Sequence, residues 1–153
     1  MRTWFPHVTV AAVIEREGRF LLVEENTVDG VRLNQPAGHL EENESLVEAC
    51  VRESLEETAH HVEVESLVGV YQWTRPDRTI TYMRFVFACQ ALSEEAGRGL
   101  DEGIIRPVWL TPEEMRAQRS RLRSPMVMDC VEDYLAGRRF PLELIRLYER
   151  SKS

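Results

Sequence analysis

Residues 38–60, GHLEENESLVEACVRESLEETAH, combine the start of a helix with an unusual run of acidic side chains. Ser45 is followed three residues later by Glu48, the spacing of a capping box, which predicts a helix beginning near Ser45. Later in the stretch, three carboxylates follow at the i, i+3 and i+4 spacing that places side chains on one helix face: Glu53, Glu56 and Glu57. Like charges at this spacing repel one another, so the pattern calls for a compensating group.

The three carboxylates continue the apolar face of the predicted helix. At about 100° per residue, Leu46, Ala49 and Cys50 fall within about 60° of Glu53, on the same side of the helix. Carboxylates that extend a buried face are partly shielded from water, which strengthens their mutual repulsion. Clustered oxygen ligands suit Mg²⁺ or Mn²⁺, and a solvated acidic helix face is the alternative interpretation.

Composition limits the possible partners and the compartment. The net charge of −7, with 26 acidic and 19 basic residues, argues against a general nucleic-acid binder, which would carry basic patches. The apolar stretch VTVAAVI is too short to span a membrane and has no preceding basic region, so we expect neither a membrane segment nor a secretion signal. Three cysteines without a CxxC pair favour reduced thiols in a cytoplasm.

The rest of the chain predicts one α/β domain over residues 1–153, with a mixed sheet covered by helices on both sides. Segments rich in β-branched and aromatic residues, bounded by turn signals, predict strands at 7–14, 19–24, 62–73, 80–90 and 104–110. N-cap and N1-proline signals at 111–112 and 124–125 predict two further helices. The second begins a C-terminal helical segment at about 124–150, with Gly137 as a helix-end signal.

The acidic stretch resembles the signature of the Nudix hydrolases. In this sequence the signature occupies residues 38–60 as Gly38, five residues, Glu44, seven residues, Arg52-Glu53, two residues and Glu56-Glu57. Three positions depart from it: the aliphatic residue after Arg-Glu is Ser54, the closing glycine is Ala59 and the aliphatic residue after that is His60. If the closing glycine caps the helix in the left-handed region, alanine there should cost on the order of 1 kcal/mol or shift the cap.

The resemblance extends beyond this box to the NudJ-like phosphatases, a bacterial subfamily of the Nudix hydrolases. The segments that carry it are PHVTVA, NQPAGHLE, QW with PD four residues on, RFVFA, LRSP and RRFPLELI. It implies a Nudix-type α/β/α sandwich and an enzyme that releases orthophosphate with Mg²⁺ or Mn²⁺. The implied substrates are small pyrophosphorylated compounds: hydroxymethylpyrimidine pyrophosphate, thiamine pyrophosphate and nucleoside di- and triphosphates.

The resemblance also implies roles for the residues of the box. The metal ligands would be Glu53, Glu56 and Glu57. Arg52 would pair with Glu44 or a helix glutamate and hold the carboxylates in place, although an i,i+4 surface pair with Glu48 fits the spacing equally well. Gly38 would let the loop backbone approach the metal site, where the simpler interpretation is a turn glycine.

Residues outside the box are candidates for the general base and for substrate contacts. A helix glutamate is the expected base. The resemblance also implies that an acidic residue in the loop before a late strand, here Asp101 or Glu102, could serve, and solvated loop residues are the simpler interpretation of these two. Trp73 and Gln72 could offer a π face and an amide to a pyrimidine or base. Arg84 could contact terminal phosphate oxygens.

Two other functions remain open from the sequence. One is a Nudix hydrolase for another nucleotide, such as ADP-ribose or an oxidised nucleotide. The other is a non-catalytic Nudix-fold sensor, which would be expected to lose the glutamates that this chain retains. We expect a monomer, with a homodimer as the alternative.

Overall fold

The strands form a mixed sheet built around the N-terminal strand, in a computed structural model that describes residues 2–148. Its strands are β1 (His7–Arg16), β2 (Arg19–Thr27), β3 (Gly30–Asn34), β4 (Ala37–His39), β5 (His60–Thr74), β6 (Thr81–Glu94) and β7 (Ile104–Leu110). They follow the order β3-β2-β1-β6-β5, with β4 paired to β1 and β7 paired to β2. Because β1 is parallel to β6 and antiparallel to β2 and β4, the predicted mixed sheet is confirmed.

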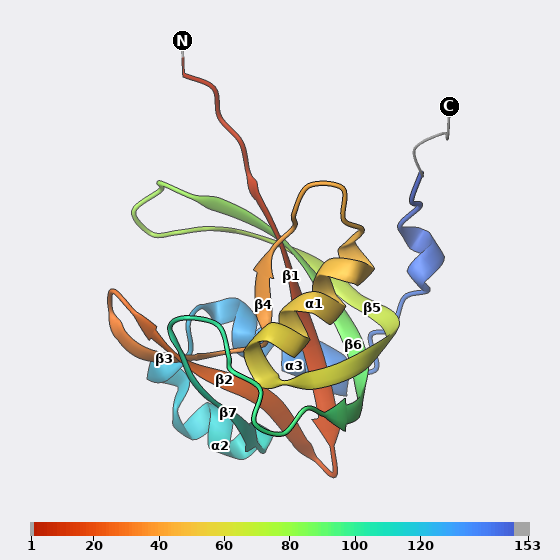
Figure 1. The fold of residues 1–153 in the computed structure, drawn as a ribbon. Coiled ribbons are helices and arrows are strands. Elements are labelled where there is room, and N and C mark those ends of the chain that lie inside the picture. The colour runs from red at the N-terminus through yellow and green to blue at the C-terminus, as the bar shows by residue number, and fades with distance from the viewer. Residues whose placement is uncertain (1, 149–153) are drawn as a thin grey trace.

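Two helices cover opposite faces of this sheet, α1 (Leu46–Thr58) and α3 (Pro125–Leu135) (Figure 1). Successive side chains of β1 point to opposite faces, as in any strand. Val10, Ala12 and Ile14 pack with Ala49 and Cys50 of α1. Ala11 and Val13 belong to the second core, with residues of α3. The chain therefore has the predicted α/β/α sandwich, and its two apolar cores fix which face each helix covers.

The helix starts that the sequence predicts are confirmed. The Ser45 hydroxyl accepts a hydrogen bond from the backbone N–H of Glu48, whose side chain accepts one from the N–H of Ser45. Thr111 forms the same capping box at α2 (Pro112–Ala117), and Ser124 caps α3. The predicted helical segment 124–150 contains α3 and the 3₁₀ turn η2 (Leu142–Leu144), and residues 149–150 lie outside the described part.

The three departures from the signature have different structural outcomes. Ala59 caps α1 in the left-handed region, with φ 60° and ψ 19°, so the cap stays at the position where a glycine was expected. His60 is buried, and its Nδ1 lies 2.8 Å from the carbonyl oxygen of Thr58. Ser54 is fully buried, and its hydroxyl has no hydrogen-bond partner among the described residues. All three residues are buried, Ser54 within α1 and the other two at its C-terminal end.

No helix within residues 2–148 combines the length and the apolar character needed to cross a lipid bilayer. The three cysteines are buried and free of disulfide bonds.

Candidate active site

The acidic face of α1 is shielded from water, as the helical projection predicts. The residues Glu53 and Glu57 are only 8% and 9% exposed, and Glu56 is partly buried. All three follow Ala49 and Cys50 along the helix face that packs against the sheet. The carboxylates therefore extend a buried face and do not form a solvated acidic stripe.

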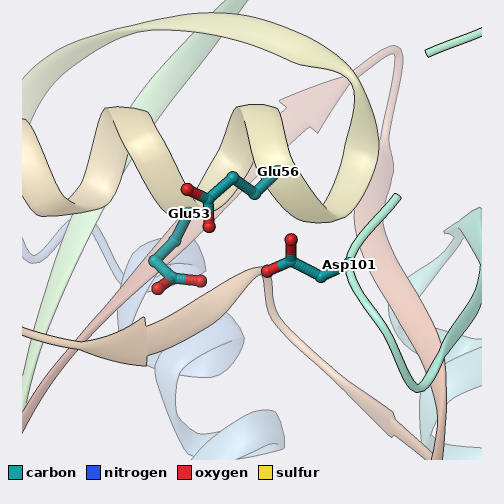
Figure 2. Close-up of side chains that lie close together, drawn as sticks. All are labelled: Glu53, Glu56 and Asp101. Carbon is teal, nitrogen blue, oxygen red and sulfur yellow. The ribbon is translucent and has the colours of Figure 1, made fainter. Parts of the chain in front are cut away.

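A fourth carboxylate joins this face from a distant loop. Ligand oxygens of Glu53, Glu56 and Asp101 all lie within 4.8 Å of one another. Figure 2 shows Glu53 and Glu56 projecting from α1 toward Asp101, which comes from the loop before β7. The backbone N–H of Asp101 donates to the carbonyl oxygen of Glu56 at 3.1 Å, which fixes the loop against the helix. Asp101 is exposed, as the sequence favoured for a loop residue, and it also belongs to the carboxylate cluster, whereas Glu102, which is exposed too, does not.

Burial raises the pKa of every helix carboxylate in this site. Desolvation is the largest cause for Glu53 and Glu56, and the charge of Asp101 raises both pKa values further. Burial raises the pKa of Glu57 to about 8, even though its Oε1 accepts a hydrogen bond from the N–H of Ala37 at 2.9 Å. Glu57 lies outside the cluster formed with Asp101, and this bond leaves its other oxygen, Oε2, available.

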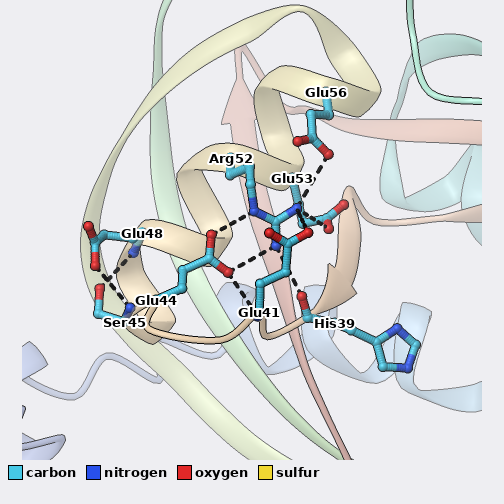
Figure 3. A network of polar contacts seen from close by, with 8 residues as sticks. All are labelled: His39, Glu41, Glu44, Ser45, Glu48, Arg52, Glu53 and Glu56. Atoms are coloured by element: carbon cyan, nitrogen blue, oxygen red, sulfur yellow. Dashed lines mark hydrogen bonds and ion pairs between the residues drawn. The ribbon is translucent and has the colours of Figure 1, made fainter.

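Arg52 is the cation that holds these carboxylates together (Figure 3). Its Nε and Nη2 donate to the two oxygens of Glu44 at 2.6 and 3.0 Å, and its Nη1 donates to Glu53 at 2.7 Å and to Glu56 at 3.3 Å. These bonds lower the pKa of Glu44 and raise that of Arg52. The alternative pairing with Glu48 does not occur, because the Glu48 carboxylate caps the helix.

Gly38 leaves room for Glu53. A Cβ atom at this position would lie 2.2 Å from the carboxyl carbon and Oε1 of Glu53, and 2.5 Å from its Oε2. With the Glu53 carboxylate in its present position, the backbone of β4 can approach it this closely because residue 38 has no side chain. The close approach predicted for Gly38 is thus seen in the structure.

A cavity of about 670 Å³ meets the site at Ala37, Gly38 and His39. Its walls include Trp73, which stacks on Tyr82 with ring centroids 6.1 Å apart and planes 14° apart. The structure brings Trp73 to this cavity and does not bring Gln72, which is exposed. Neighbouring residues of a strand face opposite sides, so β5 cannot offer both side chains to one pocket.

Arg84 lines the same cavity but is almost completely buried, with 5% of its surface exposed. Its Nη2 donates to the amide oxygens of Gln35 at 2.7 Å and Asn34 at 3.2 Å. Within residues 2–148 no carboxylate forms an ion pair with this guanidinium, and its Nε has no hydrogen-bond partner. A buried cation with only neutral hydrogen-bond partners is suited to an anionic ligand.

Comparison with known proteins identifies the family of this arrangement. Residues 5–130 match the NUDIX domain. The chain belongs to the Nudix hydrolase family. This Nudix hydrolase is 45% identical to phosphatase NudJ from Escherichia coli K12 over 141 residues, 92% of this chain and 90% of that protein.

Solved structures agree with this assignment. A NUDIX hydrolase from Nitrosomonas europaea superimposes with a TM-score of 0.91 at 49% identity, covering 94% of this chain and 98% of that one. An ADP-ribose pyrophosphatase from Streptococcus suis has a TM-score of 0.64 at 19% identity, with 85% and 92% of the two chains covered. The second likeness is one of fold alone.

The residues of this Nudix hydrolase suit the divalent metal that the family generally uses. The cluster offers only carboxylate oxygens, the donors that hard cations such as Mg²⁺ and Mn²⁺ prefer. The guanidinium of Arg52 forms an ion pair with Glu53 of the cluster and another with Glu44. It therefore neutralises the negative charge of the cluster only in part. Gly38, whose missing side chain leaves room for the Glu53 carboxylate, also lines the cavity. The donor set and the excess negative charge therefore fit a bound cation.

Proposed function

We propose that this Nudix hydrolase releases orthophosphate from small pyrophosphorylated compounds in a Mg²⁺- or Mn²⁺-dependent reaction. The proposed substrates are hydroxymethylpyrimidine pyrophosphate, thiamine pyrophosphate and nucleoside di- and triphosphates. The observation that carries the proposal is the carboxylate cluster beside Gly38, adjacent to a cavity with an aromatic wall and a buried arginine. The 45% identity to phosphatase NudJ over nearly the whole chain supports it.

The carboxylates have distinct roles in this proposal. Glu53 and Glu56 would hold the metal together with Asp101, and Glu57 would add its free Oε2 from the neighbouring helix position. A bound divalent metal neutralises phosphoanhydride oxygens and offsets the charge that develops during displacement.

The chain's own residues prepare the hydrolytic step. Arg52, anchored by Glu44, fixes the Glu53 and Glu56 side chains, so their oxygens keep one arrangement before the substrate binds. A helix glutamate takes a proton from the attacking water as the new phosphorus–oxygen bond forms and the anhydride bond breaks.

The cavity provides the substrate contacts. Trp73 would stack on the heteroaromatic ring, and its own stacking on Tyr82 holds the indole plane in place. Arg84 would donate to phosphate oxygens, which would supply the anionic partner that its guanidinium lacks. We propose that the enzyme acts in the cytoplasm, where the three buried cysteines stay reduced, and that it does so as a monomer.

The test is orthophosphate release with Mg²⁺ from each proposed substrate, compared by kcat/KM, with ADP-ribose as a control. We expect a clear preference for hydroxymethylpyrimidine pyrophosphate and thiamine pyrophosphate. Hydrolysis of ADP-ribose alone would replace the proposed substrate class with another Nudix activity. No hydrolysis of any of these compounds would contradict the catalytic function and favour a Nudix-fold sensor.

A further inference from the structure

The buried cation of the cavity projects from the face of the sheet that is opposite the Glu53 carboxylate. Gly38 of β4 pairs with Val10, which packs against α1, and a Cβ at Gly38 would point at Glu53 on that side. Alternation along β1 turns the neighbouring Thr9 to the other face. Thr9 pairs with Arg84 of β6, and both side chains line the cavity. Arg84 and Thr9 are therefore neighbours on a face of the sheet that Glu53 does not share.

The guanidinium of Arg84 has a donor left for a ligand. Its Nη2 donates to Asn34 and Gln35, and both acceptors are neutral amide oxygens. Its Nη1 has no hydrogen-bond partner within residues 2–148 and, unlike Nε, is not fully enclosed. The hydroxyl of Thr9, on a strand about 4.8 Å away, makes no side-chain hydrogen bond in that range either. An anion beside these two groups would gain one charge-assisted hydrogen bond and one neutral one.

The N-terminal end of α3 adds positive potential at the same place. Gln35 links Arg84 to the first turn of α3, because its side-chain amide donates to the carbonyl oxygen of Val127 at 2.7 Å. Ser124 and Met126, at the start of this helix, line the cavity. The N–H groups of Met126 and Val127 both donate to Ser124. The helix therefore contributes the positive end of its dipole and no direct hydrogen bond.

The carboxylates in the cavity wall oppose an anion only weakly. Glu25 forms an ion pair with Arg123 at 2.7 Å. Asp29 and Asp129 are exposed, so water and salt screen their charges. Arg84 is shielded from water, and its charge therefore acts through a lower dielectric. The guanidinium dominates the potential in its own part of the cavity.

We propose that Arg84 and Thr9, with the N-terminal end of α3, form a subsite that binds orthophosphate without a metal. Orthophosphate suits the subsite because its several oxygens can accept hydrogen bonds from both side chains at once. In the reaction it is the released product, and this assignment rests on the proposed function. The product then stays in the cavity after hydrolysis and competes with the next substrate molecule.

The probe is inorganic phosphate, titrated into the protein by calorimetry in EDTA, with chloride at the same ionic strength as the reference. We expect the wild type to bind one phosphate per chain saturably. Arg84→Met should weaken this binding by about tenfold or more, because the cation and its hydrogen bond are lost. Thr9→Val should weaken it by about threefold, because valine has a similar shape and lacks the neutral donor. Thr81→Val is the matched control, since Thr81 lies on β6 outside the cavity wall, and it should bind phosphate as the wild type does.

Circular dichroism checks that each variant folds, and Thr9→Val carries the test if Arg84→Met does not fold. No saturable binding by the wild type, or an unchanged affinity in Thr9→Val or in folded Arg84→Met, would overturn the inference. Hydrolysis of the proposed substrates in Mg²⁺ is measured separately. Phosphate binding without any hydrolysis contradicts the proposed function and leaves the subsite standing, whereas hydrolysis without phosphate binding in EDTA does the reverse.

Discussion

Replacing Gly38 with alanine should displace Glu53 and inactivate the enzyme while the fold remains. The added Cβ would lie 2.2 Å from the Glu53 carboxyl carbon, and two carbons in ordinary contact are about 3.5–4.0 Å apart. The carboxylate must therefore retreat by roughly 1.3–1.8 Å. Misplacing a catalytic group by about 1 Å costs roughly 100-fold in rate, so we expect at least that loss in kcat. The backbone itself tolerates alanine, because φ of Gly38 is not positive.

The assay is orthophosphate release over a range of Mg²⁺ concentrations, with thermal unfolding followed by circular dichroism. Gly99→Ala is the matched control, because a Cβ at Gly99 would meet no atom within 4 Å and this variant should keep wild-type kcat. A Gly38→Ala enzyme whose kcat stays within threefold of wild type would refute the reasoning that Glu53 needs this space.

Three further predictions concern the helix that carries the site. Ala59→Gly should raise the free energy of unfolding by about 0.5–1 kcal/mol, because the left-handed cap strains an L-residue. The control is Ala96→Gly, in a loop position without positive φ, which should lower the free energy of unfolding. Urea titration measures both variants. Ser54→Ala should raise the same free energy by about 1 kcal/mol by removing a buried hydroxyl that has no partner, and a loss of stability would show that the hydroxyl is satisfied. The pKa of Glu57 is raised to about 8 in the folded state, so the folded protein binds more protons than the unfolded chain between roughly pH 4.5 and 8. In EDTA the Tm should therefore fall as pH rises through this window, less steeply in Glu57→Gln, and equal slopes would contradict the assignment.

The parts of the site encoded by short-range patterns could be predicted from the sequence. The capping box at Ser45 and the i, i+3, i+4 spacing of the glutamates depend on one helix, so the helical projection correctly identified its acidic buried face. The pairing of Arg52 with Glu44 was also anticipated, although spacing alone could not separate it from a pair with Glu48. That choice is made by the capping bond of Glu48, which removes the competing partner.

Contacts between distant segments set the remaining features. Asp101 reaches the cluster because its N–H bonds to the C-terminal turn of α1, and nothing in its local sequence specifies that contact. Arg84 donates a hydrogen bond to the side chain of Gln35, which in turn donates to the carbonyl oxygen of Val127 in α3, so segments distant in the sequence meet here. The position of Gln72 could have been anticipated, since the alternation of a strand separates it from Trp73.

The most direct test of the central claim is a calorimetric titration of Mg²⁺ into the wild-type protein and into Asp101→Asn. If Glu53, Glu56 and Asp101 form the metal site, the wild type will bind Mg²⁺ saturably, and the loss of one carboxylate will weaken binding by about tenfold or more. Indistinguishable binding by the two proteins, or no saturable binding by the wild type, would contradict the assignment of this cluster as the metal site.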